Sequence, residues 1–307
     1  GRLDEGRTLM LALTAEMDAK GADWRRLDTR RAWGELGLLM LREARYVEAA
    51  DYFWNARSWP DCAYVLERLL STQELVEWVE RHSSPPVAEP RHYESDPRAL
   101  LARRLMREAG FERALDFFDP EARGRARAYI QAMQTASEPG AAAKLRAQHY
   151  WQAARIMRDY GMQLFGAELA PDHAWVGGSY DWWDLTEERR KKIYAPNYTI
   201  NLVTYAEAAR TKETRILPDK RFHYRYRAVR LAELAAGLLP NNHEQAARIY
   251  CVAGSWIQLR DPAGAERLYQ QLVVRCPETT LGQAASAAHW FPKVDLATIE
   301  PFDDPEP

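Results

Sequence analysis

The chain has 307 residues, enough to bury one large or two ordinary cores, and its 47% hydrophobic and 28% charged residues are those of a folded rather than a disordered protein. Its 42 basic and 44 acidic residues give a net charge of −2, so no global field attracts it to nucleic acid or to an anionic membrane. No stretch approaches the roughly 18 apolar residues that a membrane-spanning helix needs.

The composition indicates a bacterial source. Seven lysines stand against 35 arginines, which indicates a GC-rich, bacterial coding sequence. The chain begins without an initiator Met or a signal segment, so we expect a mature or excised piece of a bacterial protein from the cytoplasm or the periplasm. Cys62, Cys251 and Cys276 lack CxxC spacing, so we expect neither a disulfide framework nor a metal site, but buried small side chains.

Two segments near the start predict helices. Residues 3 to 19 place Leu9, Met10 and Leu13 on one stripe at helical spacing. The next segment, AWGELGLLMLREARYVEAADYF at 32 to 53, predicts two short helices folded back on each other as a hairpin.

This hairpin carries the W-x2-L-G…A-x3-F skeleton of a tetratricopeptide repeat on Trp33, Leu36, Gly37, Ala49 and Phe53. It therefore resembles that family, although Met40 stands where a tyrosine is usual and Pro60 comes one place before the expected proline. The resemblance implies antiparallel helix hairpins stacked into an α-solenoid, with glycine and alanine where the two helices approach most closely.

Internal repetition supports the resemblance. LREARYVEAADYF at 41 to 53 recurs as MREAGFERALDFF at 106 to 118, an offset of 65 residues that is near two repeat lengths. Residues 62 to 82 supply another helical pair between the two copies. A third copy lies at 249 to 277, and its residues at repeat positions are Ala253, Trp256, Ala265, Tyr269, Leu272 and Pro277. The unit before it is a weaker match, and its corresponding residues are Ala228, Ala232, Ala235 and Pro240.

The predicted architecture is thus an all-α chain, an α-solenoid of tetratricopeptide-like hairpins with a central irregular insertion. A proline-rich loop is expected at 83 to 98, and a long helix that ends near Phe165. We divide the chain into N-terminal repeats (1–135), the long helix with an aromatic insertion (136–215), C-terminal repeats (216–293) and an acidic tail with prolines (294–307).

The insertion has the most unusual local composition, with aromatic residues beside Asp172, Asp181, Asp184 and two glycines; the aromatic residues are Trp175, Tyr180, Trp182 and Trp183. Exposed tryptophans would form a platform for a protein partner or a sugar. Alternatively, the loop folds back and fills the hollow of the solenoid. We favour this packing, because folded chains seldom leave so much apolar area exposed, and keep the platform as the partner-binding hypothesis.

A second candidate is DKRFHYRYRAVR at 219 to 230, where basic and aromatic residues alternate; the residues singled out as partner contacts are Arg221, His223, Tyr224 and Arg225. Such alternation is typical of binding to acidic peptides or to nucleic acid. The simpler interpretation is a first helical turn whose aromatics pack and whose arginines extend along the surface. The absence of net positive charge disfavours nucleic acid as the partner.

Catalytic residues, metal ligands and cofactor sites are not expected, since the sequence contains no GxSxG, HExxH, GxxxxGK[ST] or GxGxxG signature. The predicted function is a non-catalytic scaffold for protein–protein interaction, as a component of a larger bacterial chain or complex, that binds a protein or peptide. The alternative is a glycan-binding or carbohydrate-active protein that uses the tryptophans of the insertion, with Asp181, Asp184 or Glu168 as acids.

Overall fold

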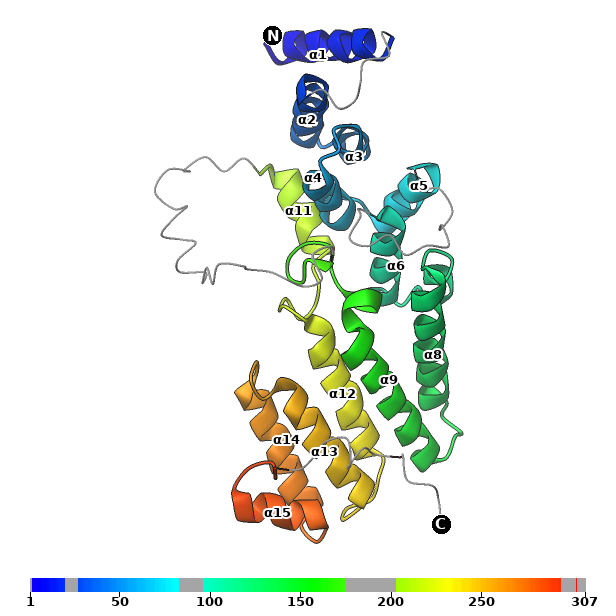
Figure 1. Cartoon of the computed structure of the whole chain (residues 1–307), viewed down its shortest axis with the longest axis vertical. Coiled ribbons are helices and arrows are strands. Elements are labelled where there is room, and N and C mark those ends of the chain that lie inside the picture. The colour runs from blue at the N-terminus through cyan, green and yellow to red at the C-terminus, as the bar shows by residue number, and fades with distance from the viewer. Residues whose placement is uncertain (1, 20–26, 83–95, 175–202, 294–301, 303–307) are drawn as a thin grey trace. The chain divides into compact units, whose positions relative to one another are not determined.

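In the computed structural model, residues 2–19, 27–82, 96–174, 203–293 and 302 are described. Within these ranges all regular structure is helical, and no strand occurs. Helices that follow one another along the chain often pack antiparallel, as Figure 1 shows for α13 with α14. The all-α prediction is therefore confirmed. The described helices include none that is both long enough and apolar enough to cross a membrane.

The chain forms two compact units, each assembled from two separate segments. Unit 1 comprises residues 1–110 and 167–221, and unit 2 comprises residues 111–166 and 222–307. The second segment of unit 1 is thus inserted in sequence between the two segments of unit 2. The four ranges predicted from the sequence are each continuous along the chain, whereas each unit combines two segments. The four-range division stays a prediction.

Unit 1 begins with the predicted helices. Helix α1 spans Arg2–Ala19, and α2 (Leu27–Arg42) packs against α3 (Tyr46–Asn55) as the expected hairpin. A Cβ placed on Gly37 would lie 2.7 Å from the ring of Phe53, so only glycine allows the two helices to approach this closely. The rings of Trp33 and Tyr52 stack at 5.5 Å on the same hairpin.

The remainder of unit 1 contains shorter helices around a buried core. Their bounds are α4 Trp59–Tyr64, the π-helical turn η1 Val65–Leu69, α5 Thr72–His82, α6 Pro97–Arg107 and α11 Tyr205–Glu213. The helical pair predicted for 62 to 82 is confirmed, with η1 between its helices. The loop predicted for 83 to 98 falls largely outside the described residues. Helix α6 begins at Pro97, before the predicted end of that loop. Asp96 caps the helix by accepting a hydrogen bond from the Arg98 N–H.

Unit 2 is built on longer helices. Helix α8 (Pro120–Ser137) and α12 (His223–Gly237) both pack against α9 (Ala143–Phe165), the long helix predicted from the sequence. The short helix α7 spans Phe111–Ala114. Three further helices complete the unit (Figure 1): α13 Glu244–Ile257, α14 Pro262–Arg275 and α15 Thr280–Ala288.

The segments that were predicted to be copies of one repeat adopt different structures. The copy at 249 to 277 forms the hairpin of α13 and α14, as predicted. The copy at 106 to 118 does not repeat α3, because its counterpart segment contains only the four-residue α7 and the boundary between the two units falls at residues 110 and 111. The similar sequences at 41 to 53 and at 106 to 118 therefore adopt different structures.

Candidate functional site

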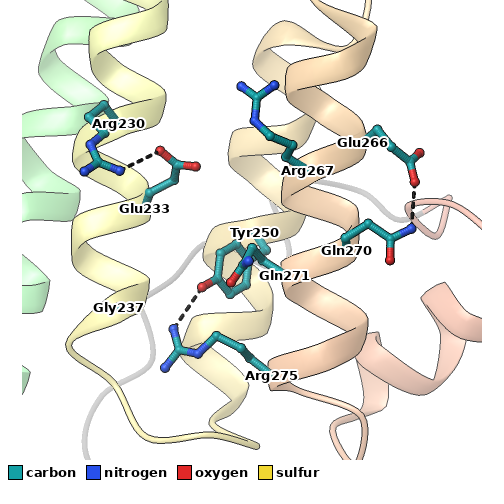
Figure 2. A pocket seen from close by; sticks show the side chains of 9 residues that line it. All are labelled: Arg230, Glu233, Gly237, Tyr250, Glu266, Arg267, Gln270, Gln271 and Arg275. Carbon is teal, nitrogen blue, oxygen red and sulfur yellow. Dashed lines mark hydrogen bonds and ion pairs between the residues drawn. The ribbon is translucent and has the colours of Figure 1, made fainter.

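A groove of about 470 Å³ lies on unit 2 between α12 and α14, and Tyr250 of α13 lines it between them (Figure 2). Helix α12 contributes Arg230, Glu233 and Gly237. Helix α14 contributes the opposite wall, which is formed by Glu266, Arg267, Gln270, Gln271 and Arg275. We call this feature the groove.

The pattern of α14 explains why its wall of the groove is polar. Asp261 begins the helix by accepting a hydrogen bond from the Gly264 N–H at 3.0 Å, with Pro262 in the first turn. Leu268 and Leu272 are buried on one face, whereas the positions that line the groove at 266, 267, 270 and 271 are exposed on the other. An amphipathic helix thus places its amide and charged side chains over the groove.

Arg275 fixes the two walls together at one end of the groove. Its guanidinium donates hydrogen bonds to the carbonyl oxygens of Ala236 (3.0 Å) and Leu239 (2.8 Å) at the end of α12, and to the Tyr250 hydroxyl at 2.9 Å. A cation at a helix C-terminus satisfies carbonyls that have no partner within the helix. Burial raises the pKa of Tyr250 above its usual value despite the nearby Arg275, so the phenol stays protonated.

The remaining polar groups of the groove divide into paired and available ones. Arg230 pairs with Glu233 at 3.4 Å, and Gln270 donates to Glu266 at 2.7 Å along α14 (Figure 2). Within the described ranges, Arg267 and Gln271 make no hydrogen bond of their own. A guanidinium and an amide are therefore available to a ligand, and neither faces a salt-bridge partner within those ranges.

Unit 1 contains a second concentration of charge, which is buried. Glu67 on η1 pairs with Arg107, and Glu168 pairs with Arg103 and accepts a hydrogen bond from the Trp59 indole at 3.0 Å. Glu67 also accepts from the backbone N–H of Glu168 at 3.3 Å, so the two pairs are linked. Burial raises the pKa of Glu168, against the opposing attraction of Arg103.

The alternative function assigned Glu168 as a candidate acid. Both of its carboxylate oxygens are engaged, and the residue is only 2% exposed. Asp181 and Asp184, the other two candidate acids, lie outside the described residues. The contacts of Glu168 are those of a buried ion pair that joins segments far apart in the sequence.

The predicted partner contacts fall in two groups. Trp175, Tyr180, Trp182 and Trp183 lie outside the described residues. In the second group His223 and Tyr224 are 0% and 3% exposed, so their rings belong to the core of unit 2, as the packing interpretation predicted. Arg221 and Arg225 are half-buried, and the Arg225 guanidinium carbon lies 4.6 Å from the centre of the Phe222 ring.

Sequence reasoning did not find the groove. Its only signal was the polar spacing of Arg267, Gln270 and Gln271, which is also the ordinary pattern of a solvated helix face. Only the neighbouring α12 turns that face into the wall of a depression. Among the described residues, no three His, Cys, Asp or Glu side chains gather in a way that could hold a metal ion.

Comparisons of the chain with protein-family models, with curated proteins and with solved structures find no match.

Proposed function

We propose that the chain is a non-catalytic binding protein that holds an extended segment of a protein partner, and that the groove between α12 and α14 is the contact surface. The observation that carries this proposal is a depression of about 470 Å³ whose walls offer arginine, glutamine and glutamate side chains. Small-molecule sites of this size are lined mostly by apolar and aromatic side chains. A polar groove instead suits a peptide, whose backbone requires hydrogen-bond donors and acceptors along its length.

The tetratricopeptide-like pattern supports the same proposal. In the first hairpin Gly37 lies against Phe53, and both residues stand at positions of the repeat skeleton. In the hairpin of α13 and α14, Gly254 instead lies against Phe291, which follows α15. The Tyr269 ring packs on both Trp290 and Phe291. We infer a degenerate repeat arrangement, in which such hairpins present side chains to a peptide or protein.

The charge of the groove specifies the partner further. Glu233 and Glu266 are engaged by Arg230 and Gln270, whereas Arg267 is available. We therefore expect a bound segment to carry an acidic side chain opposite Arg267, because a carboxylate accepts two parallel hydrogen bonds from a guanidinium.

The proposal is tested by panning a phage-displayed library of random peptides against the full chain and measuring the affinity of selected peptides by fluorescence polarisation. Arg267→Glu reverses the available charge, so we expect it to weaken binding about tenfold or more, which corresponds to about 1.4 kcal/mol. The matched control is Arg127→Glu on the exposed face of α8, which leaves binding unchanged. A library that yields no acidic peptide, or peptides that bind equally to the Arg267 variant, would contradict the proposal.

A further inference from the structure

The two ends of the groove differ in chemical character. Figure 2 shows Arg267 toward one end, and Gly237 and Arg275 toward the other. Arg267 offers an available guanidinium to a ligand, whereas Arg275 is already engaged by the oxygen atoms that join the two walls. We call the first the arginine end and the second the glycine end.

The glycine end has room for a side chain of a ligand. Arg275 of α14 donates hydrogen bonds to the carbonyl oxygens of Ala236 and Leu239, which stand on either side of Gly237 in the sequence. Gly237 therefore lies at the level of the last turn of α14. A Cβ placed on Gly237 would meet no atom within 4 Å, so the space beside it is open.

Two exposed aliphatic side chains flank the glycine end. Val274 is 71% exposed and stands seven residues after Arg267 and three after Gln271, so it continues the face of α14 that lines the groove. On α12, Leu234 is 38% exposed and precedes Gly237 by three residues. An exposed valine gains nothing from burial, and β-branching disfavours the helix, so the fold does not account for Val274.

The distance between the two ends selects one backbone conformation for a bound segment. Seven residues of an α-helix separate Arg267 from Val274 by about 10 Å along the axis. Side chains three residues apart in a polyproline II segment point the same way and lie about 9 Å apart. Side chains on one face of a β-strand lie about 7 or 13 Å apart, which fits less well.

The wall between the two ends also suits a polyproline II segment. This conformation forms no internal hydrogen bonds, so its carbonyl oxygens remain available as acceptors. The Gln271 side chain, which makes no hydrogen bond within the described ranges, stands between Arg267 and Val274 on α14 and can donate to such a carbonyl. Proline-rich segments lose little conformational entropy on binding, because the conformation is already formed.

We propose that the groove selects a proline-rich segment in the polyproline II conformation, with an acidic and an aliphatic side chain three positions apart. The carboxylate pairs with Arg267, and the aliphatic side chain packs against Val274 and Leu234 in the space beside Gly237. This inference rests on the proposed function, because it specifies the partner of the same groove. Either direction of the bound segment places its two side chains at the two ends, so both orders are tested.

The experiment measures binding of defined fluorescent peptides to the full chain by fluorescence polarisation. The probes carry the core Asp-Pro-Pro-Leu or the reversed core Leu-Pro-Pro-Asp between Gly-Ser flanks, with capped termini. We expect the better of the two orders to bind about fivefold more tightly than the same core with one or three prolines. Serine in place of the leucine should weaken binding about tenfold, and two glycines in place of the prolines several-fold.

Two variants of the chain test the glycine end. Gly237→Leu fills the open space, so we expect unchanged helicity and binding of the leucine peptide about tenfold weaker. Gly124→Leu on α8 is the matched control, because a Cβ there also meets no atom within 4 Å, and it should leave affinity unchanged. Val274→Ser changes only an exposed position, and we expect it to reduce the preference for the leucine peptide over the serine peptide.

The outcomes separate this inference from the proposed function. Affinity that depends on Arg267 but not on the spacing, on Gly237→Leu or on Val274→Ser would overturn the inference and leave a groove that binds acidic segments of any kind. Failure of both cores to bind, while acidic peptides without prolines do, would overturn it equally. Peptides that bind with the same affinity to the Arg267→Glu variant would instead contradict the proposed function itself.

Discussion

Gly161 of α9 lies directly against the ring of Tyr224 of α12, and a methyl group added at Gly161 would overlap three atoms of that ring. The contact joins two helices whose sequences are separated by the whole second segment of unit 1. Tyr224 is buried and cannot swing into solvent without leaving the core. The close approach of α9 and α12 therefore depends on the absence of a side chain at position 161.

Gly161→Ala should consequently destabilise the chain. Alanine gains up to about 1 kcal/mol of helix propensity over glycine, but overpacking a buried contact typically costs about 1 to 3 kcal/mol. We expect a net loss in the free energy of unfolding, measured by urea titration followed by circular dichroism. Gly124→Ala in α8 is the control, because a methyl group there meets no atom within 4 Å and should leave stability unchanged or slightly higher. A Gly161→Ala protein as stable as the Gly124→Ala protein would contradict the contact.

From the hydrogen bonds between Ser71 and Glu74 at the start of α5, we predict that the free energy of unfolding depends on pH. The Ser71 backbone N–H donates to Glu74 at 2.7 Å, and the Glu74 N–H donates to the Ser71 hydroxyl at 3.2 Å. Burial alone would raise the pKa of Glu74, but the hydrogen bonds from Ser71 and the charge of Arg210 outweigh it and hold the pKa below 4.5. Glu74 therefore contributes stability that is present above the unfolded pKa and is lost as pH falls through the folded pKa.

The variant Ser71→Ala tests this sign. At neutral pH it should cost about 1 kcal/mol, the usual value of a lost helix cap. The difference from the unchanged protein should shrink when the pH falls below the folded pKa of Glu74, because the protonated carboxyl no longer benefits from the donors. Urea unfolding at a series of pH values measures the difference, and NMR titration should show the pKa of Glu74 rising in the variant. A cost independent of pH would indicate that Glu74 takes no part in the cap.

The three thiols should be unreactive in the folded chain. Cys62, Cys251 and Cys276 are free and buried, and burial raises the pKa of all three thiols, to about 12 for Cys251. Because the thiolate is the reactive form, a disulfide reagent at mildly alkaline pH should find almost none of it. We expect slow reaction with Ellman's reagent in native buffer and rapid release of three equivalents in concentrated guanidinium chloride. Rapid native reaction of any thiol would show that its surroundings open readily.

Parts of the fold were predictable because they rest on local rules. Helical periodicity identified α1 and α9, and the W-x2-L-G…A-x3-F skeleton identified the first hairpin. The segment at 106 to 118 misled the same reasoning. Its sequence is similar to that of α3, but the boundary between the two units at residue 110 depends on contacts with residues far along the chain. Periodicity contains no information about such contacts.

The candidate sites were less predictable for the same reason. The basic and aromatic alternation at 219 to 230 drew attention to Arg225, but nothing in the sequence indicates that Arg260, which follows α13, packs against the same Phe222 ring. The alternation also could not distinguish Tyr224, which is buried against Gly161, from Arg225, which reaches the Phe222 ring. Tertiary packing decides which residues of one helical turn belong to a site.

The buried pair of Glu67 and Arg107 gives the last prediction. Their side chains are 1% and 8% exposed, so Arg107→Met would leave the Glu67 carboxylate in the core without its guanidinium. Removing one partner of a buried ion pair typically costs about 3 to 5 kcal/mol, whereas neutralising both is far less harmful. We expect the double variant Glu67→Gln with Arg107→Met to recover part of that loss, because glutamine keeps an oxygen for the backbone N–H of Glu168 and carries no charge. Urea unfolding of the single and double variants measures the coupling, with exposed Arg127→Met as the control expected to change stability by less than about 0.5 kcal/mol. A double variant less stable than Arg107→Met alone would show that the carboxylate of Glu67 stabilises unit 1 through its other contacts rather than through this pair.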